Sequence, residues 1–308
     1  MSSAPSTVWT TSHPTPANWM SVGALGLIWG GTFMVVSIAL RGYGPLTVAC
    51  ARTTLGAVAL MGLTILLRRP MPRSGVLPYV AFIGALNTAV PFSLLSWGQQ
   101  YAPSAFAGIS MAALPLFVLP MAHFFSDEKL SMRRLTGVVI GFCGALVLIG
   151  PDLRLIGHGM APLGQLACLG ATVSYAIASV LTRRCPPIDS VALAALTLVV
   201  GSILLIPAML IFEGVPGWTD SSTGMAILFL GFVPTALAAL LRVTVIRSAG
   251  SVFMTLVNYQ VPLWSVLFGV MVLSEDLPLR FFAALALILT GLAISQWRSL
   301  LRLFAHSA

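Results

Sequence analysis

Apolar residues fill this chain in runs that are about as long as a bilayer is thick. A helix needs about 20 apolar residues to cross the hydrocarbon. Cutting the sequence at its charged and turn residues gives ten segments of roughly that size: 20–40, 46–67, 76–97, 102–125, 135–149, 161–181, 191–211, 224–241, 251–273 and 280–296. With 58% hydrophobic residues and only 8% charged ones, the chain cannot give a soluble globule a wettable surface. The sequence therefore predicts an all-α integral membrane protein with ten transmembrane helices.

Part of the chain is repeated at a constant shift of 147 residues. Eight positions coincide without a gap: Ala102/Ala249, Ser104/Ser251, Pro115-Leu116/Pro262-Leu263, Glu128/Glu275, Leu130/Leu277, Arg133/Arg280 and Gly144/Gly291. Proline, glutamate, arginine and glycine in register favour an internal duplication over two unrelated helix pairs whose loops share a composition. The predicted organisation is a disordered cytoplasmic tail at 1–19, a first five-helix repeat at 20–150, a second at 161–298 and a cytoplasmic tail at 299–308.

Basic residues gather in one set of loops, which indicates the orientation because Lys and Arg are retained on the cytoplasmic side. The side that holds both termini collects twelve of them: Arg68, Arg69, Arg73, Lys129, Arg133, Arg134, Arg183, Arg184, Arg242, Arg247, Arg298 and Arg302. The other side has three, Arg41, Arg154 and Arg280. This distribution predicts a multi-pass inner-membrane protein with both termini in the cytoplasm. Since each repeat has an odd number of helices, the halves insert in opposite orientations. Inverted repeats are typical of secondary transporters that work by alternating access around a midplane site.

Other classes of protein are disfavoured by what the sequence lacks. The net charge is +8, but the basic residues lie between apolar runs, so they indicate membrane topology rather than nucleic-acid binding. There is no Gly-rich phosphate loop and no metal-ligand spacing around the four cysteines, so we expect no cofactor and no metal site. The sequence shows no nucleophile–base pattern and no metal-ligand pattern of the kind that a membrane enzyme needs. It also lacks the continuous polarity that would line a passive channel. The expected partners are the lipid bilayer and a small-molecule substrate, with the chain a monomer or a weak homodimer.

Several motifs resemble those of a known transporter family. The first segment carries Trp29-Gly30-Gly31-Thr32-Phe33, the fourth and ninth end at Glu128 and Glu275, and a glycine-containing helix follows each acid. Ten segments in two halves with these features resemble the EamA-type members of the drug/metabolite transporter superfamily, over roughly residues 20–298. The stretch 257–262, Val-Asn-Tyr-Gln-Val-Pro, is similar to the mid-membrane stretch of bacterial amino-acid exporters of the YddG type. The resemblance implies export of small metabolites, amino acids first among them. The alternative is export or import of other small metabolites, such as purine-like compounds or sugars.

Polar groups inside the hydrocarbon must be satisfied or face water, so they mark the candidate substrate site. The candidates are Trp29, Asn87, Pro91, Ser174, Tyr175, Asn258, Tyr259 and Gln260, and Pro234 is a further helix-interior proline. A proline in a helix frees a carbonyl about one turn earlier, so Pro91 is expected to expose the carbonyl of Asn87, and Pro262 that of Asn258. The alternatives are kinks without function and asparagines that only join helices. Gating or structural roles are expected for Glu128, Glu275, Pro115 and Pro262.

The charged residues give two further predictions. All eight acids fall in loops or at helix ends, so the sequence predicts facilitated diffusion or exchange rather than proton coupling through a buried carboxylate. Arg52 is the one charge well inside a segment. It either extends to the interface, as Arg near helix ends usually does, or binds a substrate carboxylate.

Overall fold

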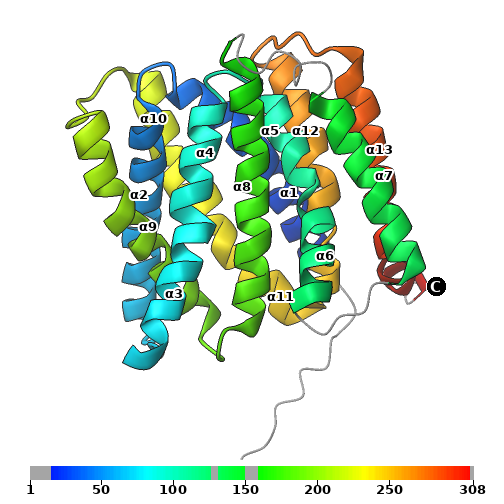
Figure 1. Cartoon of the computed structure of the whole chain (residues 1–308). Coiled ribbons are helices and arrows are strands. Elements are labelled where there is room, and N and C mark those ends of the chain that lie inside the picture. Colours follow the sequence, from blue (N-terminus) through cyan, green and yellow to red (C-terminus); the bar gives the residue numbers. More distant parts are fainter. Residues whose placement is uncertain (1–14, 126–130, 150–158, 306–308) are drawn as a thin grey trace, which may run out of the picture.

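The computed structural model describes residues 15–125, 131–149 and 159–305, and its regular structure there is helical (Figure 1). The predicted tail at 1–14 and Glu128 lie outside the described residues. The elements are α1 (Pro16–Ala39), α2 (Pro45–Leu66), η1 (Ser74–Val76), α3 (Leu77–Gly84), η2 (Ala85–Ala89), α4 (Val90–Gly98), α5 (Ser104–Ala112), α6 (Leu114–Phe125), α7 (Met132–Ile149), α8 (Ala161–Arg184), α9 (Ser190–Phe212), α10 (Ser221–Leu230), η4 (Gly231–Leu237), α11 (Ala238–Met254), α12 (Val257–Met271) and α13 (Leu279–Ala305).

These elements give the ten predicted membrane segments, because η1 to α4, α5 with α6, and α10 to α11 each form one segment. Within the described residues, eight helical stretches are long and apolar enough to cross a membrane. The other two segments are α7, with 18 residues, and α12, with 15. The prediction of an all-α integral membrane protein with ten helices is confirmed.

The helix contacts follow an inverted two-repeat pattern. The shift of 147 residues relates α1 to α8, α2 to α9, and α7 to α13. Equivalent helices pack against each other in the pairs α2 with α9 and α7 with α13, and α5 packs against α12, which belongs to the equivalent membrane segment of the other repeat. The contact of α1 with α12 has its counterpart in that of α8 with α5 and α6, and α1 with α11 corresponds to α8 with α4. The two five-helix repeats are therefore interlocked, and each first helix packs mainly against the opposite repeat.

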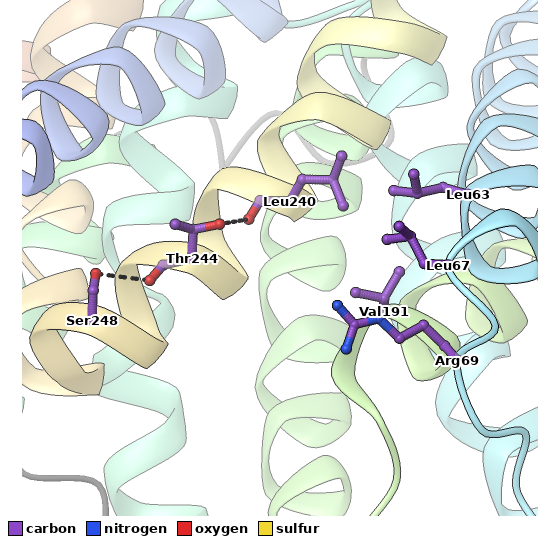
Figure 2. Close-up of a pocket in the computed structure, with 7 residues that line it drawn as sticks. All are labelled: Leu63, Leu67, Arg69, Val191, Leu240, Thr244 and Ser248. Atoms are coloured by element: carbon purple, nitrogen blue, oxygen red, sulfur yellow. Dashed lines mark hydrogen bonds between the residues drawn. The ribbon is translucent and has the colours of Figure 1, made fainter.

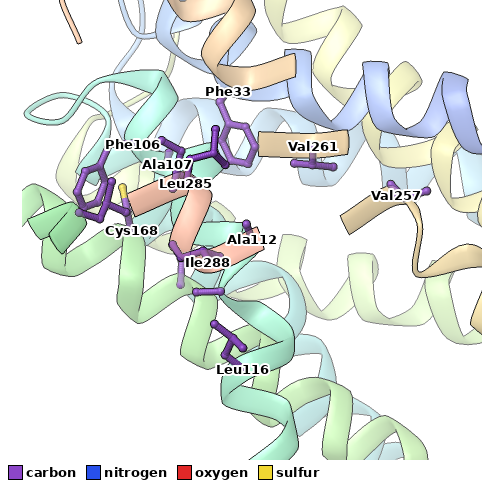
Figure 3. Packing of buried hydrophobic residues seen from close by; sticks show 14 of the residues in the cluster. Phe33, Phe106, Ala107, Ala112, Leu116, Cys168, Val257, Val261, Leu285 and Ile288 are labelled. Carbon is purple, nitrogen blue, oxygen red and sulfur yellow. The ribbon is translucent and has the colours of Figure 1, made fainter. Parts of the chain in front are cut away.

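Close helix packing relies on small residues at the contact. Gly137 of α7 and Gly291 of α13 face each other, and a Cβ on either would lie 2.5 Å from the carbonyl oxygen of the other. The largest apolar cluster fills the bundle interior with side chains from α1, α5, α8, α12 and α13, among them Phe106 and Ile288 (Figure 3). The glycines of the fifth and tenth segments thus form packing surfaces, as is common between membrane helices.

Two helix boundaries differ from the sequence prediction at the ends of the chain. Helix α1 begins at Pro16, inside the stretch predicted as a disordered tail. Thr15 caps it, since its side chain accepts from the Asn18 N–H at 3.3 Å, and proline suits the first helical position. Helix α13 continues to Ala305, beyond residue 298.

The predicted segments 224–241 and 251–273 imply a connecting loop at 246–250. This prediction is wrong in this structure, because α11 runs without interruption to Met254 and the chain turns at 255–256. Arg242 and Arg247 favoured a loop there, but arginine is a good helix former and marks the membrane boundary rather than a helix end. The predicted helix at 102–125 is likewise interrupted, at Ala113 between α5 and α6.

Candidate functional site

Both repeats contain a short π-helical segment in the middle of the third membrane helix. These are η2 and η4, which the shift of 147 residues superposes. In η2 the Val90 N–H bonds the carbonyl of Ala85, and in η4 the Ala238 N–H bonds that of Val233, five residues earlier in each case. Such insertions are frequent at functional sites because they alter which carbonyls the helix satisfies.

Ser174 satisfies the carbonyl that η2 leaves free. The carbonyl next after Ala85 belongs to Leu86, and in this register its donor would be Pro91, which has no N–H. The Ser174 hydroxyl of α8 donates to that carbonyl at 2.7 Å. The sequence predicts a free carbonyl at Asn87, whereas in the structure the free carbonyl is that of Leu86. Ser174, a predicted site residue of the other repeat, donates a hydrogen bond to it.

Trp29 makes the corresponding contact to η4. Its indole Nε1–H donates to the carbonyl of Pro234 at 3.2 Å. Gly30, the next residue, lies against Trp264 and the carbonyl of Val261, so α12 approaches α1 closely at this level. The predicted interior position of Trp29 agrees with this hydrogen bond. Each π-helical segment is thus bonded by the first helix of the opposite repeat.

Arg52, Phe92 and Tyr175 form a second group, which we call the arginine–aromatic cluster. The Arg52 guanidinium carbon lies 4.0 Å from the centroid of the Phe92 ring. The Tyr175 ring meets the Phe92 ring edge to face, with centroids 6.5 Å apart. Arg52 is only 6% exposed, so the side chain points into the bundle and does not extend to the interface.

The polar stretch of α12 lies in its first turn. Asn258, Tyr259 and Gln260 are all partly buried. The Gln260 side chain packs against Gly26 of α1, and the Tyr259 hydroxyl has no hydrogen-bond partner in the part of the chain that the structure describes. Pro262 is buried inside the same helix, while Pro115 lies partly buried in the first turn of α6. The structure therefore does not join this stretch by hydrogen bonds to Ser174 or Trp29.

A cavity of about 470 Å³ opens between the repeats at the end of the bundle that carries the 67–73 and 184–189 loops, which we call the basic end (Figure 2). Its lining residues are Leu63, Leu67, Arg69, Val191, Leu240, Thr244 and Ser248. Figure 2 shows α11 on one side and the α2 and α9 residues on the other. At the mouth, Arg69 Nη1 lies 3.6 Å from Asp189 Oδ2. None of the residues predicted for the site lines this cavity.

The opposite end of the bundle is held by two glutamates that cap helices of the other repeat. Glu275 accepts the N–H groups of Ser104 at 2.7 Å and Ala105 at 3.1 Å, at the start of α5. Glu213 accepts the N–H groups of Leu46 and Thr47 and the Thr47 hydroxyl, each at 2.8 Å, at the start of α2. Both carboxylates lie where a helix N-terminus favours negative charge. We call these contacts the carboxylate caps.

Several participating residues were not predicted from the sequence. Thr88 and Thr235 are buried in η2 and η4, where their hydroxyls donate to the carbonyls of Gly84 and Leu230 at 2.7 Å. Their signal was present, because Gly84/Gly231 and Thr88/Thr235 coincide at the shift of 147 residues. The cavity-lining leucines have no such signal, since the sequence does not distinguish an apolar side chain that faces lipid from one that faces the core or a cavity.

Several known proteins with similar sequences are named as transporters. The model of the EamA-like transporter family matches residues 18–150 and 162–297. The uncharacterized transporter YoaV of Bacillus subtilis (strain 168) is 25% identical over 283 residues, which cover 90% of this chain and 96% of that protein. The uncharacterized inner membrane transporter YedA of Escherichia coli (strain K12) is 27% identical over 273 residues, 88% of each chain.

One similar protein is named with its substrate, a probable terminal-alkyne amino-acid exporter of Streptantibioticus cattleyicolor. It is 26% identical over 237 residues, which cover 73% of this chain and 77% of that protein. A solved crystal structure shares the fold, with a TM-score of 0.63 at 20% identity over 92% of this chain and 98% of the other. The family model covers nearly all of both repeats, and the chain belongs to the EamA-like transporter family.

Proposed function

We propose that this chain is a secondary transporter that exports small metabolites, amino acids first among them, by alternating access between its two repeats. The cavity at the basic end is the observation that carries the proposal. Both repeats line it, and its volume of about 470 Å³ falls in the range of ~300–1,000 Å³ usual for small-molecule sites. The carboxylate caps join the repeats at the opposite end. These features are those of a conformation open on one side only.

The orientation follows from the loops. Twelve basic residues lie on the side of the termini and three on the other, which favours a cytoplasmic basic end in a bacterial inner membrane. In that orientation the cavity opens to the cytoplasm and the carboxylate caps lie on the outer side. This is the loading conformation of an exporter.

The acids support transport without tight proton coupling. The five described acids are Asp189, Glu213, Asp220, Glu275 and Asp276, and all of them lie at helix ends or in loops. Proton-coupled carriers usually have a titratable group on the pathway. We therefore propose facilitated diffusion or exchange, with the direction set by the substrate gradient.

Uptake into liposomes that hold the purified protein tests the proposal. Labelled amino acids would be offered singly and as a mixture, with and without a pH gradient, to wild type and to Asn258→Ala and Tyr259→Ala. We expect saturable uptake that ignores the pH gradient and decreases in both variants. Absence of amino-acid uptake under either condition would refute this substrate class, and purine-like compounds and sugars would be the next panel.

The role of the cavity needs a matched pair of variants, one in α11 and one at the end of η4. Leu240 lines the cavity, while Leu237, three residues earlier, is 45% exposed. Leu240→Trp places a larger side chain in the cavity and should reduce uptake, because it narrows the space that the substrate would occupy. Leu237→Trp should transport like wild type. Equal uptake by the two variants would show that substrate does not pass through this cavity.

A further inference from the structure

Arg52 carries a charge inside the membrane part of the bundle without a counter-ion beside it. It is the eighth residue of α2, so the helix rises roughly 10 Å between Pro45 and Arg52. Only 6% of its surface is exposed, and its Nε has no hydrogen-bond partner within the described part of the chain. Among residues 15–125, 131–149 and 159–305, no ion pair joins its guanidinium to an acid. A buried charge in this situation is costly unless something pairs with it.

The aromatic neighbours stabilise the charge only in part. The guanidinium lies over the Phe92 ring, whose face attracts a cation, and Tyr175 packs edge to face against the same ring. Neither ring face supplies a strong hydrogen-bond acceptor. Guanidinium presents five N–H donors in a planar fork. The arginine–aromatic cluster therefore offers donors that the described protein groups do not use.

The acid that caps the start of α2 is already occupied. Glu213 uses its two carboxylate oxygens to cap the start of α2 at Leu46 and Thr47. Thr47 lies five residues before Arg52, which corresponds to about 7.5 Å of helix. The other described acids also lie at helix ends or in loops. An acceptor for Arg52 must therefore come from outside these groups.

We propose that Arg52 binds the carboxylate of the transported substrate, with Phe92 and Tyr175 forming the walls of the subsite. The planar fork of arginine matches a carboxylate in a bidentate geometry. The inference rests on the proposed transport function and narrows its substrate class to small molecules that carry a carboxylate. Amino acids meet this requirement, whereas neutral sugars and purine bases do not.

The position of Arg52 fits a site deeper than the cavity. Leu63 and Leu67, on the same helix, line the cavity near the basic end. Arg52 lies eleven residues before Leu63, toward the opposite end. Tyr175 packs against both large apolar clusters, so it lies at their junction. A substrate that enters from the basic end reaches Arg52 after it moves along α2 into the bundle.

A pair of substrates separates carboxylate recognition from general transport. Uptake of leucine and of leucinamide, which lacks the carboxylate, would be measured for wild type, Arg52→Lys, Arg52→Gln and the control Arg41→Gln, whose arginine is exposed in the 40–44 loop. We expect leucine uptake to fall by about tenfold or more in Arg52→Gln, because a charge-assisted bond is lost, and by less in Arg52→Lys. Uptake of leucinamide should decrease much less in the same variants, and Arg41→Gln should take up both compounds like wild type. Equal leucine uptake by Arg52→Gln and wild type would overturn the inference and leave the exporter proposal standing.

Thermal unfolding of the purified protein gives a readout that does not need transport. Without ligand, Arg52→Gln should melt at the same temperature as wild type or higher, because it removes an unpaired buried charge. A lower melting temperature would mean that Arg52 holds α2 to α4 as a structural residue, and would overturn the inference. Sodium acetate and alanine should raise the melting temperature of wild type but not of Arg52→Gln, relative to sodium chloride at equal ionic strength.

The two assays together separate the two proposals. Stabilisation by carboxylates that depends on Arg52, in a protein that takes up no amino acid, would retain the subsite and refute the amino-acid substrate. Stabilisation by chloride as large as that by acetate would indicate an inorganic-anion site and overturn the carboxylate assignment. Absence of any effect of acetate and alanine on wild type would also overturn it.

Discussion

Replacing Glu275 with glutamine should make the opposite end of the bundle open more often. In the structure the two carboxylate oxygens of Glu275 accept the N–H groups of Ser104 and Ala105. These groups belong to the first turn of α5 and have no partner inside their own helix. Glu275 follows α12 of the second repeat, so the cap joins the repeats. Opening of this end by separation of the repeats has to break it.

The magnitude follows from the number of bonds lost. Glutamine keeps one carbonyl oxygen and presents an NH₂ group to the second N–H, so one of the two hydrogen bonds is lost together with the charge. A hydrogen bond to a charged group contributes about 1.5–3 kcal/mol, and Glu275 is partly exposed, so we take about 2 kcal/mol. A difference of about 1.4 kcal/mol is a factor of ten in an equilibrium. The open population should therefore rise by about 30-fold.

Labelling of a buried cysteine measures this population. Ala105→Cys places the reporter at a fully buried position beside the cap, in a background with the native cysteines replaced by alanine. When opening is fast and reversible, the rate of maleimide labelling is proportional to the open fraction. Asp276→Asn is the matched control, because it removes the adjacent carboxylate, for which no helix cap is found among the described residues. Equal labelling of Glu275→Gln and Asp276→Asn would refute the reasoning that the cap holds this end closed.

Two further predictions concern the π-helical segment and a helix cap. Ser174→Ala leaves the buried carbonyl of Leu86 without its donor and should lower the free energy of unfolding by about 1–3 kcal/mol. Ser179→Ala loses only a hydrogen bond to the Tyr175 carbonyl of its own helix and should lower it far less. Thermal unfolding compares the two variants, and equal losses of stability would contradict the role of η2. Hydrogen bonds from the Thr223 side chain and backbone, and from Ser222, lower the pKa of Asp220 from 3.8 to about 2. Because this folded-state pKa is depressed, the stabilisation by the Asp220 cap of α10 is complete above pH 3.8 and is lost as the pH falls through about 2. The difference in melting temperature between wild type and Asp220→Asn should thus stay constant from neutral pH to about pH 4 and shrink below it; shrinkage already near pH 6 would contradict the low pKa.

The helices were predictable because bilayer thickness fixes the length of an apolar run, and the repeats because proline, glutamate and glycine stay in register. The helix ends were less so. Charged residues such as Arg242 mark the membrane boundary, but a helix can continue past that boundary, as α11 does to Met254. The start of α1 at Pro16 depends on a cap by Thr15, which is a local signal inside a stretch whose composition resembles a disordered tail.

In each hydrogen bond of the candidate site, the donor side chain was predictable from the sequence and the accepting carbonyl was not. Trp29 and Ser174 were found because their side chains are polar groups in apolar segments. Their partners, the carbonyls of Pro234 and Leu86, could not be found, because every residue has a carbonyl and the helical register decides which one is free. The orientation of Arg52 had two open alternatives, and only the packing of Phe92 against it selects the interior.

The two repeats depart from symmetry at 99–103 and 246–250. The shift of 147 residues makes these segments equivalent, with Ala102 matching Ala249. In the first repeat the segment is a turn at the opposite end, next to the Glu275 cap of α5; in the second it continues α11 at the basic end, where Thr244 and Ser248 line the cavity. The two equivalent segments thus adopt different conformations in one molecule, one at the closed end and one at the end with the cavity, although only Ala102 and Ala249 are identical between them. Exchange of the two conformations between the halves would close the basic end and open the other, which is the change that alternating access requires. Residues 246–250 are helical in this conformation, which differs from the predicted loop. After such an exchange the same segment would form a loop.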